Sequence, residues 1–215
     1  MHEILESILP GDLVFDIGAN VGDKAKWFSD KGARVICVEP QPNMIAMIQD
    51  KFQTSANVVI VQSGVGEKKS KIKMNVCSES PTLSTFADHW KTGRFDNVIW
   101  DSEIYVDIIT LDDLVNKYGI PKYCKIDVEG FELNVIQGLS HKIGTISFEF
   151  TSEFITHAMQ VIERLVVLGY KEFNVSLGEL PTYNFNEWIP FYELVKVLLN
   201  AAQSNPGLWG DIYAK

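Results

Sequence analysis

Short apolar runs alternate with helix-like segments along the first part of the chain, and this alternation constrains the fold more than any other feature. Apolar, strand-like runs occupy 13–17, 33–40 and 57–62, and helix-like segments over 23–31 and 42–52 lie between them. A strand and its helix recur about every 20 to 25 residues, which is typical of a doubly wound sheet. The sequence therefore predicts an α/β fold with parallel strands connected by helices.

The regular alternation lapses from 65 to 103 and then returns. This insertion holds a hairpin-like segment (69–78) and a polar, aromatic stretch with conflicting helix and strand signals. A long irregular insertion is often a substrate lid, although a merely structural excursion has the same pattern. We expect a single domain over 1–215 that begins with a leading helix over 1–10. After the insertion, strands are expected at 104–110, 123–128, 145–150, 170–177 and 208–214, with helices at 111–118, 131–139, 154–168 and 188–202.

Charge and cysteine content exclude several classes of protein. The chain of 215 residues has a net charge of −9 and no basic block longer than the pair Lys68-Lys69, which disfavours nucleic acid and anionic membranes as partners. It has no signal-peptide pattern and no apolar run near the roughly 20 residues of a membrane span. Cys37, Cys77 and Cys124 are widely spaced, so we expect buried, reduced thiols in a cytoplasmic protein. The oligomeric state is left open.

The first strand runs into the turn DIGANVG (16–22), which combines glycines with a carboxylate. In an open parallel sheet this turn lies where ligands bind. A dinucleotide fingerprint admits a pyrophosphate at its second glycine, whereas Asn20 stands near that position here. Asp16 would repel a phosphate and attract an ammonium or sulfonium group, which favours S-adenosylmethionine. A phosphate-bearing dinucleotide and a ligand-free structural turn are the alternatives. The expected cofactor-binding residues of this turn are Asp16, Gly18, Ala19, Asn20 and Gly22, with the glycines letting the ligand lie close to the backbone.

Two further strand ends are expected to contact the cofactor. Glu39 ends the second strand, where a carboxylate can accept hydrogen bonds from both ribose hydroxyls, and Pro40 follows it. NAD would use the same acid, so Glu39 alone does not discriminate between the ligands. The third strand ends in Gln62, Ser63 and Gly64, which by the same geometry lie along the adenine edge, although a plain strand-to-loop turn is the alternative.

The segment KIDVEGFE (125–132) ends a strand that is expected to adjoin the first strand. By strand alternation Lys125, Asp127 and Glu129 share one face, where charges are costly unless paired or functional. Removing the proton of an alcohol during methyl transfer needs a general base or a metal. Asp127 and Glu129 are therefore the candidate catalytic residues, with Lys125 positioning one carboxylate or tuning its pKa, and Asp127 also reaching the cofactor. A structural ion pair, with Gly130 as a helix-entry residue, is the alternative.

Other polar residues carry weaker signals. Glu149 and Glu153 end the next strand and could hold Mg²⁺ or Ca²⁺ together with Asp127 or Glu129, but nothing in the spacing demands it, so no metal is expected. His89 in the insertion is a weak candidate for touching the substrate. Ser84 and Thr85, also in the insertion, are equally weak candidates for touching the substrate. The remaining histidines, His2, His141 and His157, are expected to be surface or loop residues.

With both charged clusters in view, the sequence resembles the FkbM-type methyltransferase family. The paired motifs DIGANVG and KIDVEG, in order and about 100 residues apart, are more specific together than either alone. The resemblance covers most of Leu13 to Phe150. Its matching elements are VFDIGANVGD (14–23), VEPQP (38–42), VQSGVGE (61–67), DIITLDDL (107–114), CKIDVEGFELNVIQGL (124–139) and SFEF (147–150).

The resemblance implies a Rossmann-like class I methyltransferase fold: a seven-stranded, mostly parallel sheet with an antiparallel last strand and helices on both faces. It also implies O-methylation of sugars, glycolipids or natural products, with S-adenosylhomocysteine as the cofactor product. By position, the DIGANVG turn would bind the methionine part, Glu39 the ribose, and Asp127 and Glu129 would lie at the reacting end. Residues 81–97 and those after Thr151 match too weakly to carry roles.

The main hypothesis is thus an S-adenosylmethionine-dependent O-methyltransferase that acts on a carbohydrate or small-molecule hydroxyl. A noncatalytic S-adenosylmethionine-binding or scaffold protein is an alternative, which the costly charges of Asp127 and Glu129 disfavour. An NAD-linked oxidoreductase is disfavoured by Asp16 and Asn20. N-methylation of an amine stays open, because an acidic site also suits a cationic substrate.

Overall fold

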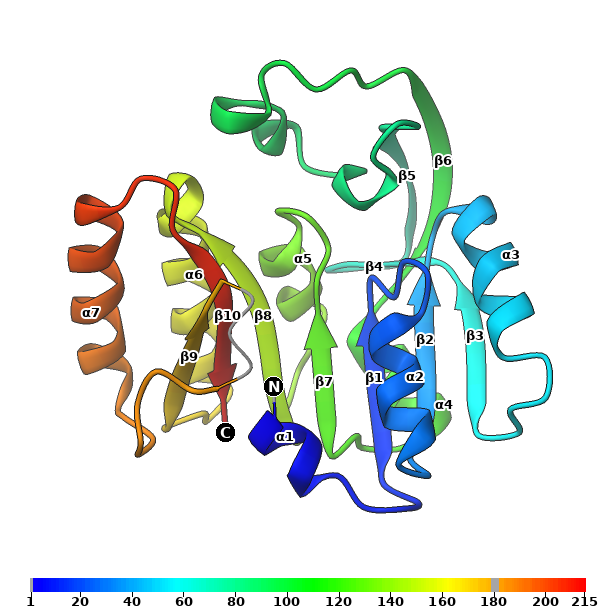
Figure 1. The fold of residues 1–215 in the computed structure, drawn as a ribbon, viewed down its shortest axis with the longest axis horizontal. Helices are drawn as coiled ribbons and strands as arrows, with labels where there is room; N and C mark the ends of the chain where they lie inside the picture. Colours follow the sequence, from blue (N-terminus) through cyan, green and yellow to red (C-terminus); the bar gives the residue numbers. More distant parts are fainter. Residues whose placement is uncertain (1, 179–181) are drawn as a thin grey trace.

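The computed structural model describes residues 2–178 and 182–215. The predictions for residue 1 and for the side chain of His2 lie outside this described part. The main sheet has seven strands in the order β3–β2–β1–β7–β8–β10–β9 (Figure 1). Strand β10 runs antiparallel to β8 and β9, and the other strand pairs are parallel. The strands are β1 (Leu13–Ile17), β2 (Arg34–Glu39), β3 (Val58–Gln62), β7 (Tyr123–Ile126), β8 (Thr145–Thr151), β9 (Phe173–Leu177) and β10 (Trp209–Ala214).

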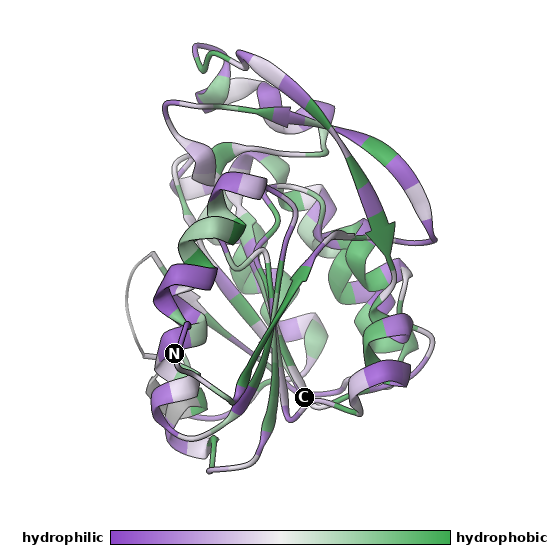
Figure 2. Ribbon diagram, turned by 90° about the vertical axis from the view of Figure 1, so that its right-hand side faces the viewer, coloured by the Kyte–Doolittle hydropathy of each residue, from purple (hydrophilic) through white to green (hydrophobic). Residues whose placement is uncertain are grey.

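Helices cover both faces of this sheet, as Figure 2 shows from the side. Apolar side chains of α1 (His2–Ser7), α2 (Asp23–Asp30) and α3 (Pro42–Lys51) pack with Val14 and Val35 on one face. Those of α4 (Leu111–Tyr118), α5 (Glu132–Gln137), α6 (Ile155–Val167) and α7 (Phe191–Ser204) pack with Phe15 and Ile36 on the other. Strands β1 and β2 are thus buried on both sides, which explains their nearly continuous apolar runs. The predicted α/β fold is confirmed, and β7 adjoins β1 as expected.

A second, three-stranded sheet leaves the main one after β3. It has the order β4–β6–β5, from β4 (Gly64–Val65), β5 (Ser70–Val76) and β6 (Ser102–Ile109). The hairpin predicted within 69–78 is wrong, because this segment is one strand that pairs with β6 beyond the insertion. The strand predicted at 104–110 likewise joins this second sheet instead of the main one. Strand pairing between distant segments leaves no local signal in the sequence.

The insertion between β5 and β6 lies above the C-terminal ends of the parallel strands (Figure 1, top). It contains three single 3₁₀ turns, η1 (Pro81–Leu83), η2 (Asp88–Lys91) and η3 (Gly93–Phe95). A fourth, η4 (Ser152–Phe154), joins β8 to α6, and the ring of Trp90 of η2 packs at a tilt against that of Phe154 of η4, with centroids 5.2 Å apart. The ion pair between Arg94 and Glu153 adds a second link. The insertion is therefore fixed over the edge of the sheet where ligands bind in this class of fold.

The three cysteines are free and buried, as expected. Among the described residues, none of the helices combines the length and the apolar character that crossing a membrane would require.

Candidate active site

A cavity lies between the insertion and the C-terminal ends of β1, β2 and β7. The structure brings to its wall eight of the residues that the sequence singled out, from four segments far apart in the chain. The insertion contributes Pro81, Thr82, Ser84 and Phe86 to the same wall. Asp16, Ala19 and Gly22 belong to the turn after β1 but do not line the cavity. The predicted residues in the wall are Gly18, Asn20, Glu39, Pro40, Ser63, Gly64, Asp127 and Glu129.

Asp16 directly precedes Ile17 and Gly18 of the cavity wall in the chain, and it is only 1% exposed. Neither of its carboxylate oxygens has a hydrogen-bond partner among the described residues. Burial raises the pKa of Asp16 to about 6, although the nearby charge of Lys125 opposes this. A buried carboxylate without a partner costs free energy that a cationic ligand nearby would reduce. Asp16 therefore fits the cationic end of the expected cofactor.

Glu39 joins the ends of β1 and β2. Its carboxylate accepts hydrogen bonds from the backbone amides of Asn20, at 3.0 Å, and Gln41, at 2.9 Å. Burial raises the pKa of Glu39 to about 7, and these two bonds oppose the rise. Asn20 itself has a φ of 48°, so the carboxylate holds a left-handed residue in the turn. Each oxygen retains acceptor capacity, which fits a ribose diol.

The glycines of the DIGANVG turn are needed for contacts within the protein. A Cβ on Gly18 would lie 1.8 Å from the carbonyl oxygen of Asp127, and one on Gly22 would lie 2.9 Å from the ring of Phe52. Gly18 admits the backbone after β7, and Gly22 admits a side chain beyond α3. That these glycines also let a ligand lie close to the backbone stays a prediction.

Lys125 and Asp127 form an ion pair with 2.5 Å between Nζ and Oδ2. The Lys125 side chain is 5% exposed and that of Asp127 is 34% exposed, so the carboxylate faces the cavity while the ammonium group is buried. Burial alone would lower the pKa of Lys125, but the carboxylates of Asp127, Asp211 and Asp16 outweigh it and raise the pKa above its ordinary value. Lys125 is thus a permanent cation that holds Asp127.

The turn after β7 differs from the sequence prediction. The strand expected over 123–128 ends at Ile126, so alternation brings Lys125 and Asp127 to one face but does not reach Glu129. Glu129 has a φ of 53° and is followed by Gly130 at 89°. A tight turn, and not a strand, therefore directs the Glu129 side chain toward Asp127.

Two side chains hold this turn in place. The Glu132 carboxylate accepts from the amides of Val128, at 3.3 Å, and Gly130, at 3.2 Å. From the insertion, the Thr85 hydroxyl donates to the carbonyl oxygen of Glu129 at 2.6 Å. Thr85 thus positions the turn, whereas a substrate contact was the expectation for it. No sequence signal marked Glu132 for this role.

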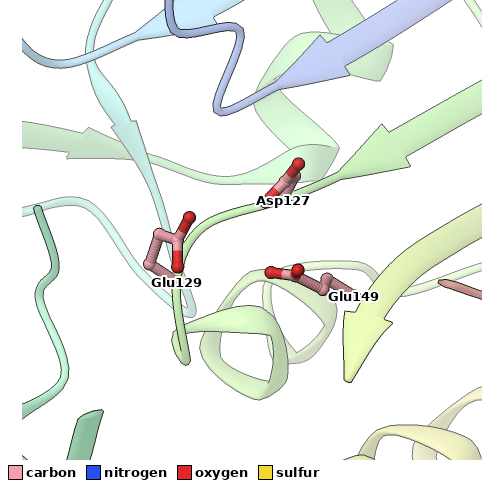
Figure 3. Close-up of side chains that lie close together, drawn as sticks. All are labelled: Asp127, Glu129 and Glu149. Carbon is pink, nitrogen blue, oxygen red and sulfur yellow. The ribbon is translucent and has the colours of Figure 1, made fainter. Parts of the chain in front are cut away.

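Three carboxylates meet at the edge of the cavity (Figure 3). Asp127, Glu129 and Glu149 of β8 each offer an oxygen within 4.8 Å of the others. Burial, and then the negative charge of Asp127, raises the pKa of both Glu129 and Glu149 well above the ordinary value. Such a cluster can accept protons or hold a hard cation, whose oxygen ligands lie about 2.3–2.6 Å away for calcium. Glu153, the other acid considered for a metal, pairs with Arg94 instead.

Three further residues that the sequence singled out, Ser84, Ser63 and His157, have defined contacts in the structure. Ser84 lines the cavity, and its Oγ accepts from the amide of Cys77. The Ser63 hydroxyl donates to the carbonyl of Asp107 at 2.6 Å. The prediction that His157 is a surface or loop residue is wrong, because it lies on α6, half-buried, and stacks on His89 with ring centroids 4.0 Å apart. That contact joins distant segments and leaves no pattern in the sequence.

Gln41 is a cavity residue that the sequence did not indicate. It is buried, its amide donates to the carbonyl of Pro81 at 3.1 Å, and its Oε1 has no partner among the described residues. Because it also lines the cavity, its free oxygen is available to a hydrogen-bond donor of the ligand. Its place two residues after Glu39 in VEPQP is the one signal that could have found it.

A family model described as "Methyltransferase FkbM domain" matches residues 16–173. The chain belongs to the FkbM methyltransferase family. The match begins at Asp16 and extends past the KIDVEG motif, so it includes both charged clusters of the site. It confirms the resemblance that the motifs indicated.

The FkbM chain is also similar to a curated protein, the hexuronic acid methyltransferase AglP of Haloferax volcanii. The two are 25% identical over 147 residues, which cover 67% of this chain and 57% of the relative. The chain thus spans a little over half the length of the curated relative that it matches.

Solved structures share the fold at low identity. A precorrin 8w decarboxylase from Methanobacterium thermoautotrophicum aligns with a TM-score of 0.54 at 11% identity, over 100% of this chain and 87% of that one. Aeropyrum pernix fibrillarin, solved with S-adenosyl-L-methionine bound, aligns with a TM-score of 0.50 at 11% identity. The alignment covers 97% of this chain and 68% of the fibrillarin chain. These likenesses establish the fold alone. With the strand order, they give the FkbM chain the Rossmann-like class I methyltransferase fold.

Proposed function

We propose that this FkbM protein is an S-adenosylmethionine-dependent methyltransferase that acts on a hydroxyl of a sugar, a glycolipid or a small natural product. The observation that carries the proposal is a pair of buried acids: Glu39, which lines the cavity, and Asp16, which directly precedes the lining residues Ile17 and Gly18 in the chain. The positively charged methionine part of S-adenosylmethionine complements Asp16, and the ribose diol of the same cofactor complements Glu39. A pyrophosphate in the same place would meet two carboxylates and be repelled.

The turn after β7, which contacts the turn after β1, has the groups that a hydroxyl acceptor needs. S-adenosylmethionine, when bound, supplies an electrophilic methyl group. Burial and the charge of Asp127 raise the pKa of Glu129, which makes its carboxylate a stronger base for the proton of the acceptor hydroxyl. Lys125 holds Asp127, whose carboxylate orients the acceptor through a hydrogen bond. Pro81 and Phe86 of the insertion line the cavity and restrict the access of water to it.

The acceptor class is supported by the relative and by the residues. AglP is named as a methyltransferase of hexuronic acid, and a sugar acid is a polyhydroxylated acceptor. The carboxylates Asp127, Glu129 and Glu149 can all accept hydrogen bonds from hydroxyl groups. We therefore place sugars and sugar acids first among the acceptors. A cytoplasmic location and the lack of a nucleic-acid partner stay predictions from the sequence.

A methyl-transfer assay tests this function. The protein is incubated with methyl-labelled S-adenosylmethionine and a panel of methyl glycosides of hexoses, deoxyhexoses and hexuronic acids, with primary amines as a comparison. The expected result is a labelled methyl ether of at least one sugar. If only the amines are labelled, the protein is an N-methyltransferase and the proposed O-methylation is wrong. Binding of S-adenosylhomocysteine without any transfer would favour the noncatalytic alternative.

A further inference from the structure

A second cavity lies between η2 of the insertion and the segment from β8 to α6. His89 and Trp90 line it from above, and Glu149, Thr151 and His157 line it from the sheet and helix side. Its volume is about 20 Å³. A water molecule needs about 10–15 Å³ on this scale, so the cavity has room for a single group of hydroxyl size.

Four buried polar atoms in this wall have no hydrogen-bond partner among the described residues. They are Nε2 of His89, Nε1 of Trp90, Oγ1 of Thr151 and Nδ1 of His157. Trp90 is 4% exposed and Thr151 is 5% exposed, so neither reaches bulk water. Only two other residues in the described part of the chain, Asp16 and Gln41, have such atoms. Buried polar groups normally have partners, so this concentration marks a place built for a polar occupant.

The chemistry of the wall selects a neutral occupant. Trp90 can only donate a hydrogen bond, which disfavours a cation. Glu149 and Glu132 also line the cavity, which disfavours an anion. Burial, and then the charge of His157, lowers the pKa of His89, so its ring is neutral near pH 7 and its Nε2 offers one donor or one acceptor. A hydroxyl group donates one hydrogen bond and accepts up to two, so it can satisfy three of these four atoms, the N–H of Trp90 among them.

This cavity adjoins the proposed reacting centre through one side chain. Glu149 lines the second cavity, and its carboxylate lies within 4.8 Å of the oxygens of Asp127 and Glu129, which line the first (Figure 3). Glu149 is therefore shared between the reacting centre and the second cavity. An acceptor that presents one hydroxyl to Asp127 and Glu129 would reach the second cavity, past Glu149, with a second hydroxyl close to the first, as adjacent hydroxyls of a sugar ring are.

We propose that the second cavity is a specificity subsite for a hydroxyl of the acceptor adjacent to the one that is methylated, held by Thr151 and Trp90. The inference rests on the proposed methyl transfer and narrows its acceptors to vicinal diols, as in sugar rings. Acceptors with a single hydroxyl leave the four polar atoms without partners and bind less tightly.

Kinetics of Thr151→Val test the subsite. Valine keeps the shape of threonine and its preference for a strand but removes the hydroxyl. With the best sugar of the panel, KM should rise about tenfold while kcat stays within about twofold, because the hydroxyl is lost from ground-state and transition-state binding alike. With wild type, the monodeoxy acceptor that lacks the bound hydroxyl should have a KM about as high as that of Thr151→Val with the full sugar. Its KM should not rise further with Thr151→Val.

Controls separate this role from a structural one. Thr145→Val changes the threonine at the opposite end of β8 and should leave KM unchanged, and Thr151→Ser should restore the wild-type KM. Should Thr151→Val fail to fold, Trp90→Phe removes the indole N–H and makes the same test. An unchanged KM in the folded variant would show that the cavity holds only a fixed water and would overturn the subsite. Failure of wild type to methylate any sugar would overturn both proposals.

Discussion

The backbone at Gly18 contacts the backbone of Asp127 so closely that a Cβ on Gly18 would lie 1.8 Å from the Asp127 carbonyl oxygen. The amide of Asp127 also donates to the carbonyl of Ile17 at 3.0 Å. The turn that is proposed to bind the cofactor and the turn that carries the proposed base are therefore in direct contact. Their relative position is fixed by a residue without a side chain.

Gly18→Ala should destabilise the protein more than a glycine replacement elsewhere in left-handed backbone. Gly169→Ala is the matched control, because Gly169 also has positive φ (99° against 79°) and nothing lies within 4 Å of its Cβ position. The control measures backbone strain alone, about 1–2 kcal/mol, and the clash at Gly18 should add at least about 2 kcal/mol. Urea unfolding of both variants gives the difference. Equal losses would contradict the contact.

Asp127→Asn and Glu129→Gln should each lower turnover by about 100-fold or more while the protein stays folded. Both changes keep the size of the side chain and remove its ability to take a proton. Glu163→Gln on the exposed side of α6 serves as the control and should leave turnover unchanged. Steady-state kinetics and circular dichroism make the comparison. Full turnover in both site variants would assign the cluster to structure.

The sequence could predict what local patterns encode. Continuous apolar runs identified β1, β2 and β3, and the charges of DIGANVG and KIDVEG marked the turns that meet at the cavity. Contacts between distant segments could not be read in this way. The partner of β5 and the packing of His157 on His89 depend on how the chain closes in space, whereas the nearness of Glu149 to Asp127 and Glu129 followed from their places at neighbouring strand ends. Glu129 could be identified as a candidate because it is an acid close to Asp127 in the sequence. The reason given for its position, strand alternation, was wrong, since a turn positions it.

Stability of the free protein should fall as pH rises from 5 to 7.5 through a contribution of Glu39. Burial raises the pKa of this carboxyl to about 7, whereas in the unfolded chain it titrates near 4.5. The folded state thus keeps a proton that the unfolded state has lost in this window, so the stabilisation is present below about pH 4.5 and lost toward pH 7. In Glu39→Gln the fall between pH 5 and 7.5 should be smaller by about 2 kcal/mol, measured by urea unfolding. An identical pH dependence in both proteins would contradict this assignment.

Methyl transfer should not require a divalent cation. Lys125 already neutralises Asp127, and the raised pKa of Glu149 favours a proton on that carboxyl, which leaves Glu129 to act as the base without a cation. Activity after dialysis against EDTA should therefore stay within about twofold of activity with added Mg²⁺. Loss of activity with EDTA and its recovery with Mg²⁺ would instead place a cation between the three carboxylates.

The most direct test of the account is a thermal-shift comparison of S-adenosylhomocysteine, NAD⁺ and buffer with wild type and Asp16→Asn. At about a hundredfold excess over its Kd, S-adenosylhomocysteine should raise the Tm of wild type by about 5 to 10 °C. The shift should be smaller in Asp16→Asn, which lacks the charge that complements the amino group, and NAD⁺ should give none. Stabilisation by NAD⁺ alone, or no shift with S-adenosylhomocysteine, would contradict the proposed methyltransferase.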